Sequence, residues 1–387
     1  MGLHGARYAL LIVAAAPFVY YALALLGSWR FFRSGNRNEE QSDFTPPVSI
    51  LKPVRGLDHE AYENFASFCW QDYPEYELLF CVGDESDPVV PVIQKLMADF
   101  PSCNVRVLYG SRRDATNDKV AKLARLTAEA RYDVLVFCDS DVRAENRYLR
   151  KVVAPLADPN VGAATCFYVS IHETSVVQWL QSVGMLSDFY PGILVAWLLD
   201  GVKFALGPTI ATTRARIAGF GGFEVIENRP GDDLLMGRLI ADQGYEVKLL
   251  RYRIDTVADY QSMRDLIMKR LRWMVVMRHM RPWGHIGLLF TLGLPWVVAA
   301  SLVAHSKTLA LLYIGTYLAL RFAMTWLIGS WGLKQRFPLR YALLIPLWDA
   351  LATGIWLRSF TRNTIRWRDQ EYYIRNGELV PAGSAAE

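Results

Sequence analysis

The stretch DVLVFCDSD, residues 133–141, decides the fold, because an uninterrupted apolar run in it ends in two aspartates separated by one serine. A short run that is apolar at every position is typical of a strand buried on both faces of a sheet. The polar residues that close the run are Asp139 and Asp141. We therefore expect a buried central strand with two carboxylates at its carboxyl end.

Four further runs share this character, and stretches with a helical pattern separate them. Strands that alternate with helices indicate an α/β domain, doubly wound around a mainly parallel sheet that helices cover on both faces. Ligands of such domains bind at the carboxyl ends of the strands. The expected strands are VSILKPV (48–54), YELLFCVGD (76–84), NVRVLYG (104–110) and VGAATCFYV (161–169), and the expected helices include 58–69, 88–99 and 117–130.

Apolar segments flank this α/β region on both sides. Residues 8–29 are uncharged and long enough to span a bilayer, and three more apolar segments lie at about 285–304, 308–330 and 341–357. The expected domains are an N-terminal transmembrane helix (1–32), a linker (33–47), a catalytic domain (48–260), an interfacial amphipathic helix (261–283), transmembrane helices (284–360) and a basic C-terminal tail (361–387).

The stretch 261–283 is both basic and amphipathic. A helix with one apolar face and many cations suits the membrane interface. Its expected apolar face holds Met263, Ile267, Leu271 and Met274, and its cations are Arg264, Lys269, Arg270, Arg272, Arg278 and Arg281.

The composition excludes several classes of protein. The formal net charge is +4, from 42 basic and 38 acidic residues, which is too balanced to indicate a nucleic-acid-binding protein. The five cysteines include no CxxC pair, which argues against a zinc site and against a disulfide framework.

Acidic residues mark three candidate sites. Asp139 and Asp141 could hold Mg²⁺ or Mn²⁺ together with a diphosphate, since hard cations are commonly bound by one or two carboxylates plus substrate phosphates; a solvated Asp-x-Asp turn is the structural alternative. Asp84 also follows a strand run and could accept hydrogen bonds from a nucleoside. Asp232 and Asp233 open a helical pattern, where they either cap the helix or supply a base for an acceptor hydroxyl.

Basic residues mark two more positions. In the stretch Lys269-Arg-Leu-Arg272-Trp273, the arginines could neutralise a diphosphate leaving group and Trp273 could form an apolar wall beside a sugar, whereas contact with lipid headgroups is the structural alternative. Asn117 and Lys119 open the helix before the central strand. Lys119 either reaches a phosphate or lies solvated at the surface.

Taken in order, these residues resemble a known family. Asp84, Asp139-Ser-Asp141, Asp233 and the xxRW that ends at Arg272-Trp273 look like the D, D, D, (Q/R)xxRW signature of membrane-bound family 2 and family 21 glycosyltransferases. The chain is most similar to the ceramide glucosyltransferases and the bacterial hopanoid glycosyltransferases. Further similarities are LLFCVGDESDP, the NxK of residues 117–119, GFGGF (219–223) and a tail that resembles WRxxxYxIR at 367–375.

The resemblance implies a fold, a set of roles and a mechanism. The fold is a nucleotide-diphospho-sugar transferase (GT-A) domain. Asp84, Asn117, Lys119 and Lys269 would serve the nucleotide sugar, Asp139 and Asp141 the UDP diphosphate and its metal, Asp233 would be the base, and Arg272 and Trp273 would close the diphosphate and acceptor end.

Two positions depart from the family pattern. Lys269 stands where the family has Gln or Arg, which keeps a charge but loses the planar fork. Asp188 falls where animal ceramide glucosyltransferases carry His. The departure at Asp188, with Asp141 in place of Gly, favours the bacterial branch.

The sequence therefore predicts an inverting transferase that moves glucose or N-acetylglucosamine from UDP-glucose or UDP-N-acetylglucosamine to a membrane lipid hydroxyl of the ceramide or hopanoid type. It is expected to be a multi-pass protein of a bacterial inner membrane with a cytoplasmic catalytic domain. The alternatives are a processive polysaccharide synthase, which shares the signature, and a catalytically silent sugar-nucleotide-binding membrane protein.

Overall fold

A computed structural model describes residues 2–34, 43–110, 115–257, 262–335, 339–367 and 370–382. The chain divides into two compact units, each described separately below. The α/β unit comprises 35–173, 202–259 and 375–387, and the helical unit comprises 1–34, 174–201 and 260–374. Residues 174–201 therefore group with the helices, although they lie inside the range expected for the catalytic domain.

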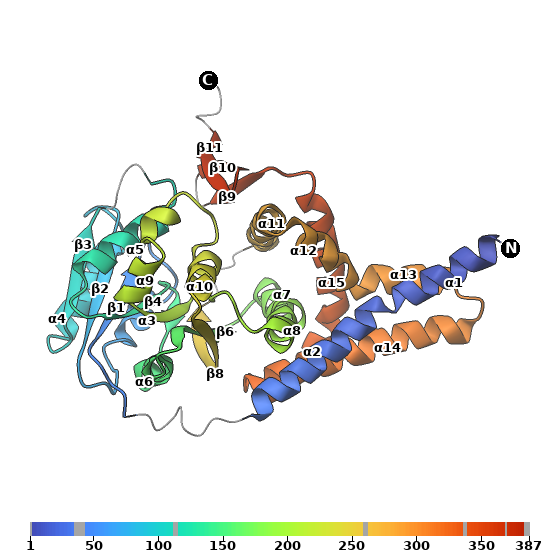
Figure 1. Ribbon diagram of the computed structural model, residues 1–387, viewed down its shortest axis with the longest axis horizontal. Coiled ribbons are helices and arrows are strands. Elements are labelled where there is room, and N and C mark those ends of the chain that lie inside the picture. Colours follow the sequence, from blue (N-terminus) through green and yellow to red (C-terminus); the bar gives the residue numbers. More distant parts are fainter. Residues whose placement is uncertain are drawn as a thin grey trace. The chain divides into compact units, whose positions relative to one another are not determined.

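An eight-stranded sheet in the order β3-β2-β1-β4-β7-β6-β8-β5 forms the α/β unit (Figure 1). Strands β3, β2, β1 and β4 are parallel, β7 is antiparallel to both β4 and β6, and β6 is parallel to β8. The mainly parallel α/β sheet is thus confirmed, with an antiparallel insertion. The strands are β1 Val48–Pro53, β2 Tyr76–Val82, β3 Val105–Tyr109, β4 Val134–Cys138, β5 Val142–Arg143, β6 Val161–Ile171, β7 Thr209–Thr213 and β8 Glu246–Val257.

Alternate residues of the central strands pack on opposite faces of this sheet. Val48, Ile50 and Leu78 join one core cluster with apolar residues of α3, α4 and α6, whereas α5 and η3 pack on the other face. Both faces are therefore covered, and the continuous apolar runs follow from this. The helices are α3 Ala61–Ala66, α4 Val90–Asp99, α5 Asp118–Glu129, α6 Tyr148–Val153, η1 Ala154–Ala157, α9 Arg214–Gly219, η3 Phe223–Val225 and α10 Asp232–Asp242.

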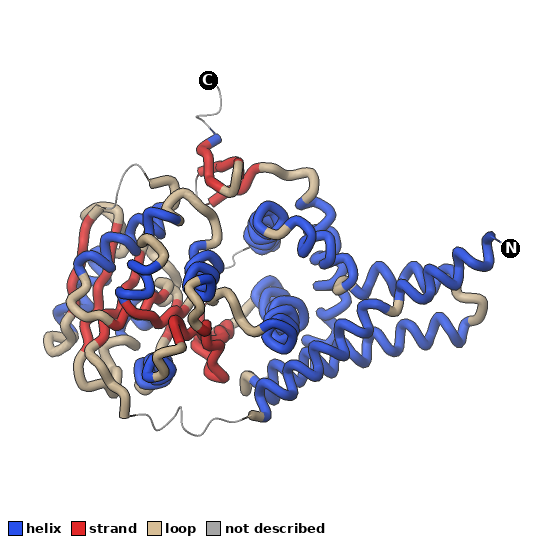
Figure 2. The backbone as a smooth tube through the Cα atoms, in the orientation of Figure 1, coloured by secondary structure: helices blue, strands red, loops and turns tan. Residues whose placement is uncertain are grey.

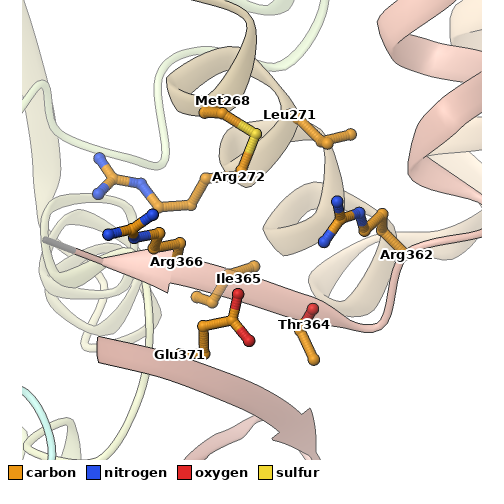
Figure 3. Close-up of a pocket in the computed structure, with 8 residues that line it drawn as sticks. All are labelled: Met268, Leu271, Arg272, Arg362, Thr364, Ile365, Arg366 and Glu371. Carbon is orange, nitrogen blue, oxygen red and sulfur yellow. The ribbon is translucent and has the colours of Figure 1, made fainter. Parts of the chain in front are cut away.

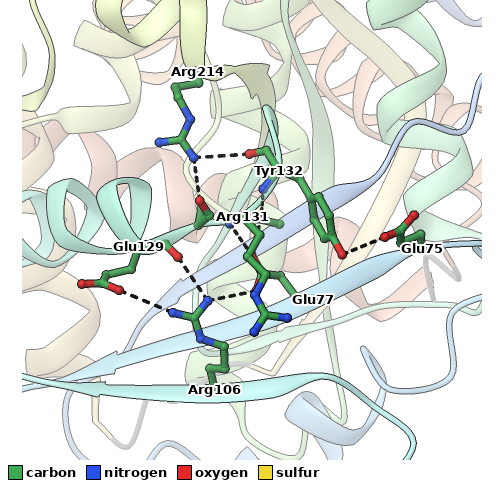
Figure 4. Close-up of polar contacts among 9 residues, drawn as sticks. Glu75, Glu77, Arg106, Glu129, Arg131, Tyr132 and Arg214 are labelled. Carbon is green, nitrogen blue, oxygen red and sulfur yellow. Dashed lines mark hydrogen bonds and ion pairs between the residues drawn. The ribbon is translucent and has the colours of Figure 1, made fainter.

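A buried carboxylate braces the amino ends of the parallel strands (Figure 4). Glu77, fully buried on β2, accepts hydrogen bonds from Ser49 Oγ at 2.7 Å and from the backbone N–H of Arg131 at 2.6 Å. The Arg106 guanidinium neutralises it at 3.2 Å and also donates to the Glu129 carbonyl at 3.1 Å. This network joins β1, β2 and β3 to the loop after α5, at the end of the sheet opposite to the carboxyl ends.

Helices make up most of the helical unit, as Figure 2 shows in blue. The strand β11, Glu378–Pro381, belongs to the α/β unit, where the Leu379 N–H donates to the Asn228 carbonyl at 2.7 Å. The helical unit contains α1 Gly2–Ala14, α2 Ala16–Arg33, α7 Val176–Gly184, η2 Met185–Phe189, α8 Tyr190–Asp200, α11 Met263–Met280, α12 Pro282–Gly287, η4 Leu288–Phe290, α13 Gly293–Val303, α14 Lys307–Trp326, η5 Leu327–Gly332, α15 Leu339–Ser359 and the antiparallel pair β9 Thr364–Trp367 and β10 Gln370–Arg375.

Among the described residues, three helical stretches are long and apolar enough to cross a membrane: His4–Arg33, Val176–Asp200 and Lys307–Gly332. The first and third correspond to expected segments, whereas the second was not expected as a span. The bent pair Pro282–Phe290 and Gly293–Val303 would make a fourth. The helix α15, which carries Asp349 and Arg358, is not one of these stretches.

The expected apolar segment 285–304 is not one straight helix, because it bends by 45° between η4 and α13. Pro295 has no N–H to donate to the carbonyl of Thr291, four residues earlier. That carbonyl instead accepts a hydrogen bond from the Tyr21 hydroxyl at 3.0 Å, and the Gly293 N–H donates to the same hydroxyl oxygen at 2.9 Å. A side chain of α2 thus satisfies both backbone groups that the bend exposes.

Candidate active site

The central strand β4 places Asp139 and Asp141 at its carboxyl end, as the sequence predicts. The Asp139 carbonyl accepts a hydrogen bond from Lys52 Nζ at 2.8 Å, and the Asp141 carbonyl accepts one from the Val257 N–H at 3.0 Å. Lys52 is fully buried, and burial lowers the pKa of its amine. The Ser140 hydroxyl donates to the Asp58 carboxylate. The Asp-Ser-Asp segment is therefore held from three sides by its backbone and by Ser140.

Lys119 lies against this segment from the first turn of α5. Its Nζ is 2.8 Å from Asp139 Oδ1 and 3.1 Å from Asp232 Oδ2. Burial lowers the pKa of Lys119, but the carboxylates of Asp139, Asp232 and Asp233 outweigh it and raise the pKa well above its ordinary value. Lys119 is therefore a firmly charged cation that bridges two of the three predicted acidic sites.

Asn117 is the N-cap of α5 and is 1% exposed. Its Oδ1 accepts a hydrogen bond from the Val120 N–H at 3.3 Å, and its Nδ2 donates to the Arg229 carbonyl at 2.9 Å. Both ends of the amide thus bind protein groups, and Asn117 fixes the start of the helix that carries Lys119. A nucleotide-binding role for Asn117 stays a prediction.

Asp232 and Asp233 form the first turn of α10, after Gly231 at φ 75°. Asp233 Oδ1 accepts a hydrogen bond from the Leu234 N–H at 2.8 Å. Burial and the neighbouring charge of Asp232 raise the pKa of Asp233 to about 6, against the lowering effect of Lys119. A carboxylate with a pKa near neutrality is suited to take a proton from a hydroxyl group.

Gly207 brings the acidic sites together, and the sequence did not single it out. A Cβ at this position would lie 3.1 Å from Asp233 Oδ2 and 3.4 Å from Asp139 Oδ2. The backbone of the segment before β7 can approach both carboxylates closely because glycine has no side chain. The Gly207-Pro208 pair is visible in the sequence. Its contact with the two aspartates could not be predicted, because both are far from it along the chain.

Asp84 follows β2 and is exposed. Its Oδ1 accepts hydrogen bonds from the Ser86 N–H at 2.8 Å and from the Ser86 hydroxyl, which lower the pKa of Asp84. The Asp87 carboxylate accepts hydrogen bonds from the Val89 N–H at 3.1 Å and from the Gly56 N–H at 3.0 Å, within the turn that precedes α4. Asp84 therefore stays ionised at the strand end, where a nucleoside contact remains a prediction.

The donor set at Asp139 and Asp141 fits a hard divalent cation, since it offers carboxylate oxygens at a strand end. Among the described residues, no group of three His, Cys, Asp or Glu side chains gathers as a complete metal site. A bound ion would therefore take its other ligands from the substrate diphosphate and from water. The Lys119 ammonium already neutralises part of the Asp139 charge.

Lys269, Arg272 and Trp273 belong to α11 in the helical unit. The Trp273 ring lies 5.7 Å from the Phe189 ring and 4.8 Å from the Arg270 guanidinium carbon, whereas Arg272 lines a pocket described below. Asp188, which departs from the family pattern, sits beside Phe189 in the π-helix η2.

The face of α11 that is buried differs from the expected one. It consists of Leu266, Arg270, Leu271 and Val275, so only Leu271 was expected. Arg270 is 4% exposed and donates to Gln181 Oε1 at 3.2 Å, which excludes the headgroup contact that its charge suggested. The arginine is tolerated because α7 supplies a polar acceptor for it.

Comparisons with known proteins identify relatives of the chain. The family model described as glycosyl transferase family 21 matches residues 9–380. Ceramide glucosyltransferase 3 of Caenorhabditis elegans is 22% identical over 397 residues, which cover 96% of this chain and 83% of that protein. A ceramide glucosyltransferase of Candida albicans is 33% identical over 139 residues, 32% of this chain and 26% of that protein.

A solved structure shares the fold. The mannosyltransferase PcManGT from Pyrobaculum calidifontis, in complex with GDP-Man and Mn²⁺, aligns with a TM-score of 0.58 at 18% identity, covering 90% of this chain and 99% of that one. The GT-A-like fold expected from the sequence is thereby confirmed.

Proposed function

The chain belongs to glycosyl transferase family 21, and from this premise we propose that it moves glucose or N-acetylglucosamine from a UDP-sugar to a membrane lipid hydroxyl of the ceramide or hopanoid type, with inversion at the anomeric carbon. The names of its relatives and the three apolar helical stretches among the described residues support this proposal. We further propose a multi-pass protein of a bacterial inner membrane, with its catalytic domain in the cytoplasm.

The observation that carries the proposal is the environment of Asp233. Its pKa of about 6 leaves most of the carboxylate ionised at neutral pH, yet basic enough to accept a proton. Asp233 and Asp139 both lie against Gly207, so a proposed base and a candidate diphosphate site lie within one small region of the α/β unit.

The proposed reaction is a single displacement. Asp233 removes the proton of the acceptor hydroxyl while the hydroxyl oxygen attacks the anomeric carbon from the face opposite to the leaving group. The bond between that carbon and the β-phosphate oxygen breaks, and UDP leaves with the bonding electron pair. Protonated Asp233 then returns its proton to solvent.

The other acidic and basic residues are proposed to hold the donor. Asp84 receives the nucleoside, and Asp139 and Asp141 hold Mg²⁺ or Mn²⁺ with the diphosphate. When bound, such an ion neutralises charge that develops on the leaving UDP. Lys119, already oriented by Asp139 and Asp232, supplies a fixed positive charge beside the same carboxylates.

The residues of α11 are assigned by resemblance. Arg272 is proposed to neutralise the departing diphosphate through its planar fork, and Lys269 to add positive charge to the donor end. Trp273 is proposed to form the apolar wall of the acceptor site. Its contacts with Phe189 and Arg270 give that ring a fixed position within the helical unit.

The direct test incubates membranes that contain the protein with radiolabelled UDP-glucose or UDP-N-acetylglucosamine and either ceramide or a hopanoid alcohol. We expect a labelled lipid with one donor, and about a hundredfold less or lower still with Asp233→Asn. Absence of labelled lipid for every pairing would overturn the proposal. A labelled product of high molecular mass would instead support the processive polysaccharide synthase.

A further inference from the structure

The helical unit contains a concentration of positive charge in a pocket between α11 and the strand β9 (Figure 3). Three guanidinium groups line it, and a single carboxylate and one hydroxyl complete its polar surface. Apolar side chains of α11 and β9 form the remainder. The lining residues are Met268, Leu271, Arg272, Arg362, Thr364, Ile365, Arg366 and Glu371.

Arg278, six residues beyond Arg272 on α11, holds one side of the pocket in place. Its guanidinium donates to the carbonyls of Ser359 at 2.6 Å and Arg362 at 2.8 Å, and to Asn363 Oδ1 at 2.7 Å. These bonds fasten the segment between α15 and β9 to α11. The backbone that presents Arg362 is therefore held in place rather than left as a loose tail.

The antiparallel pairing of β9 with β10 fixes the other wall. In this register Arg366 lies directly opposite Glu371, so one of the three arginines has an acidic cross-strand neighbour. The formal charge of the lining is therefore positive, with three arginines and one glutamate.

Arg362 carries a further sign of a missing ligand. Its Nε is buried and makes no hydrogen bond within the part of the chain that the structure describes. A buried donor without an acceptor is unfavourable, so an oxygen acceptor would be favoured there. Arginine forks match the oxygens of a phosphate group, which can accept several such hydrogen bonds at once.

Exposed aromatic residues follow the two helices α11 and α15 in the chain. Trp283, just beyond the end of α11, is 83% exposed, and Phe360, just beyond α15, is 43% exposed. Exposed aromatic rings beside cations are typical of the level of lipid headgroups. The apolar floor of Leu271 and Ile365 can contact the first carbons next to a phosphate ester.

We propose that a phosphate group binds at the open side of this pocket, with Arg362 and Arg366 as ligands in addition to Arg272. The phosphate belongs either to an anionic lipid headgroup or to a nucleotide diphosphate, and the two sources share the chemistry that the pocket recognises. The assignment does not depend on the identity of the transferred sugar or of its acceptor.

The test measures binding rather than transfer. Full-length protein in detergent is titrated by native mass spectrometry with dioctanoyl phosphatidylglycerol, with uncharged dioctanoylglycerol and with UDP. The double variant Arg362→Gln/Arg366→Gln removes both new ligands. Arg264→Gln, an exposed arginine of α11 outside the pocket lining, is the matched control.

We expect wild-type protein and Arg264→Gln to bind phosphatidylglycerol about tenfold or more tightly than the double variant, and no protein to show saturable binding of dioctanoylglycerol. A tenfold loss for UDP alone would identify the nucleotide as the source of the phosphate. Unchanged affinity of the double variant for both ligands would overturn the proposal. If the double variant does not fold, the single variant Arg366→Gln, at an exposed position, serves instead under the same criteria.

Discussion

Two clusters of opposite charges, one in each unit, show how the same residue types serve different ends. In the α/β unit, Lys119 faces Asp139 and Asp232, with side chains 27%, 32% and 10% exposed. In the helical unit, Arg321 pairs with Asp349, and these side chains are 5% and 6% exposed. The first cluster has more carboxylates than cations and is open to solvent, whereas the second is neutral and closed.

Both charged residues of the closed cluster bind protein groups on several sides. Arg321 Nε donates to Asp349 Oδ2 at 2.9 Å, and its other nitrogens donate to Asp349 Oδ1 and to the carbonyl and hydroxyl of Ser187. The Tyr317 hydroxyl donates to the same carboxylate at 2.6 Å. The cluster thus joins α14, α15 and the π-helix η2, where it binds a backbone carbonyl. An unequal charge balance and access to solvent distinguish a reactive cluster from a structural one.

The substitution Asp233→Asn should distinguish the reactive cluster from the structural cluster most strongly. Loss of a general base lowers kcat by about 10²–10⁴-fold, whereas folding should not suffer, because the raised pKa means that the ionised carboxylate opposes folding at neutral pH. Steady-state kinetics and a thermal melt check both expectations. Asp242→Asn, at the other end of α10, is the control that should retain activity; a destabilised Asp233→Asn would place this residue with the structural cluster.

The substitution Arg321→Met should lower the stability of the protein without changing its affinity for UDP. Removing one partner of a buried ion pair typically costs about 3–5 kcal/mol, because Asp349 stays buried without its cation. Denaturant unfolding in detergent measures the loss, and the double variant Arg321→Met/Asp349→Leu should recover much of it. UDP affinity of the folded fraction should be unchanged. Equal stability of wild type and Arg321→Met would show that the closed cluster is not structural.

The substitution Gly207→Ala tests whether activity depends on the positions of the Asp139 and Asp233 carboxylates beside Gly207. A methyl group 3.1 Å from Asp233 Oδ2 must displace that oxygen by a few tenths of an ångström. We expect kcat to fall by about tenfold, since small displacements of a catalytic group are costly, with a modest change in stability. Gly287→Ala, at a glycine with φ −58° and nothing near its side-chain position, controls for the loss of backbone freedom.

The substitution Lys119→Met should have the subtlest effect, a shift in pH dependence. Lys119 lowers the pKa of Asp233, so its removal should raise that pKa and move the acidic limb of kcat/KM to higher pH. Lys119→Arg should leave the limb near its original position. A limb that does not move would mean that Lys119 acts on the donor alone.

Much of the open cluster could be predicted from the sequence, because each aspartate lies at the beginning or end of a recognisable local pattern. Asp139 and Asp141 follow a buried strand, and Asp233 opens a helix. Lys52 and Gly207 could not be found in this way, since their importance arises from contacts with residues more than 20 positions away. The helix 176–200 was obscured because its buried polar side chains reduce the apparent hydropathy of a span.

The closed cluster could not be predicted at all. Arg321 and Asp349 are isolated charges in apolar helices, and only the packing of α14 against η2 reveals their partners. The bend at Thr291 has the same origin, because Pro295 marks the site but Tyr21 of α2 supplies the partner. Local sequence patterns therefore predict where charged residues lie, whereas tertiary contacts decide whether those residues form a closed cluster or an open one.

The most direct test of Asp233 as the base is the pH dependence of kcat/KM for labelled-lipid formation between pH 5 and 8. Asp233 must be ionised to accept a proton, so activity is present above its pKa and lost as pH falls through about 6. We predict about a tenfold fall per pH unit below this value, and no such limb in the residual activity of Asp233→Asn. A flat wild-type profile, or the same limb in Asp233→Asn, would contradict this role.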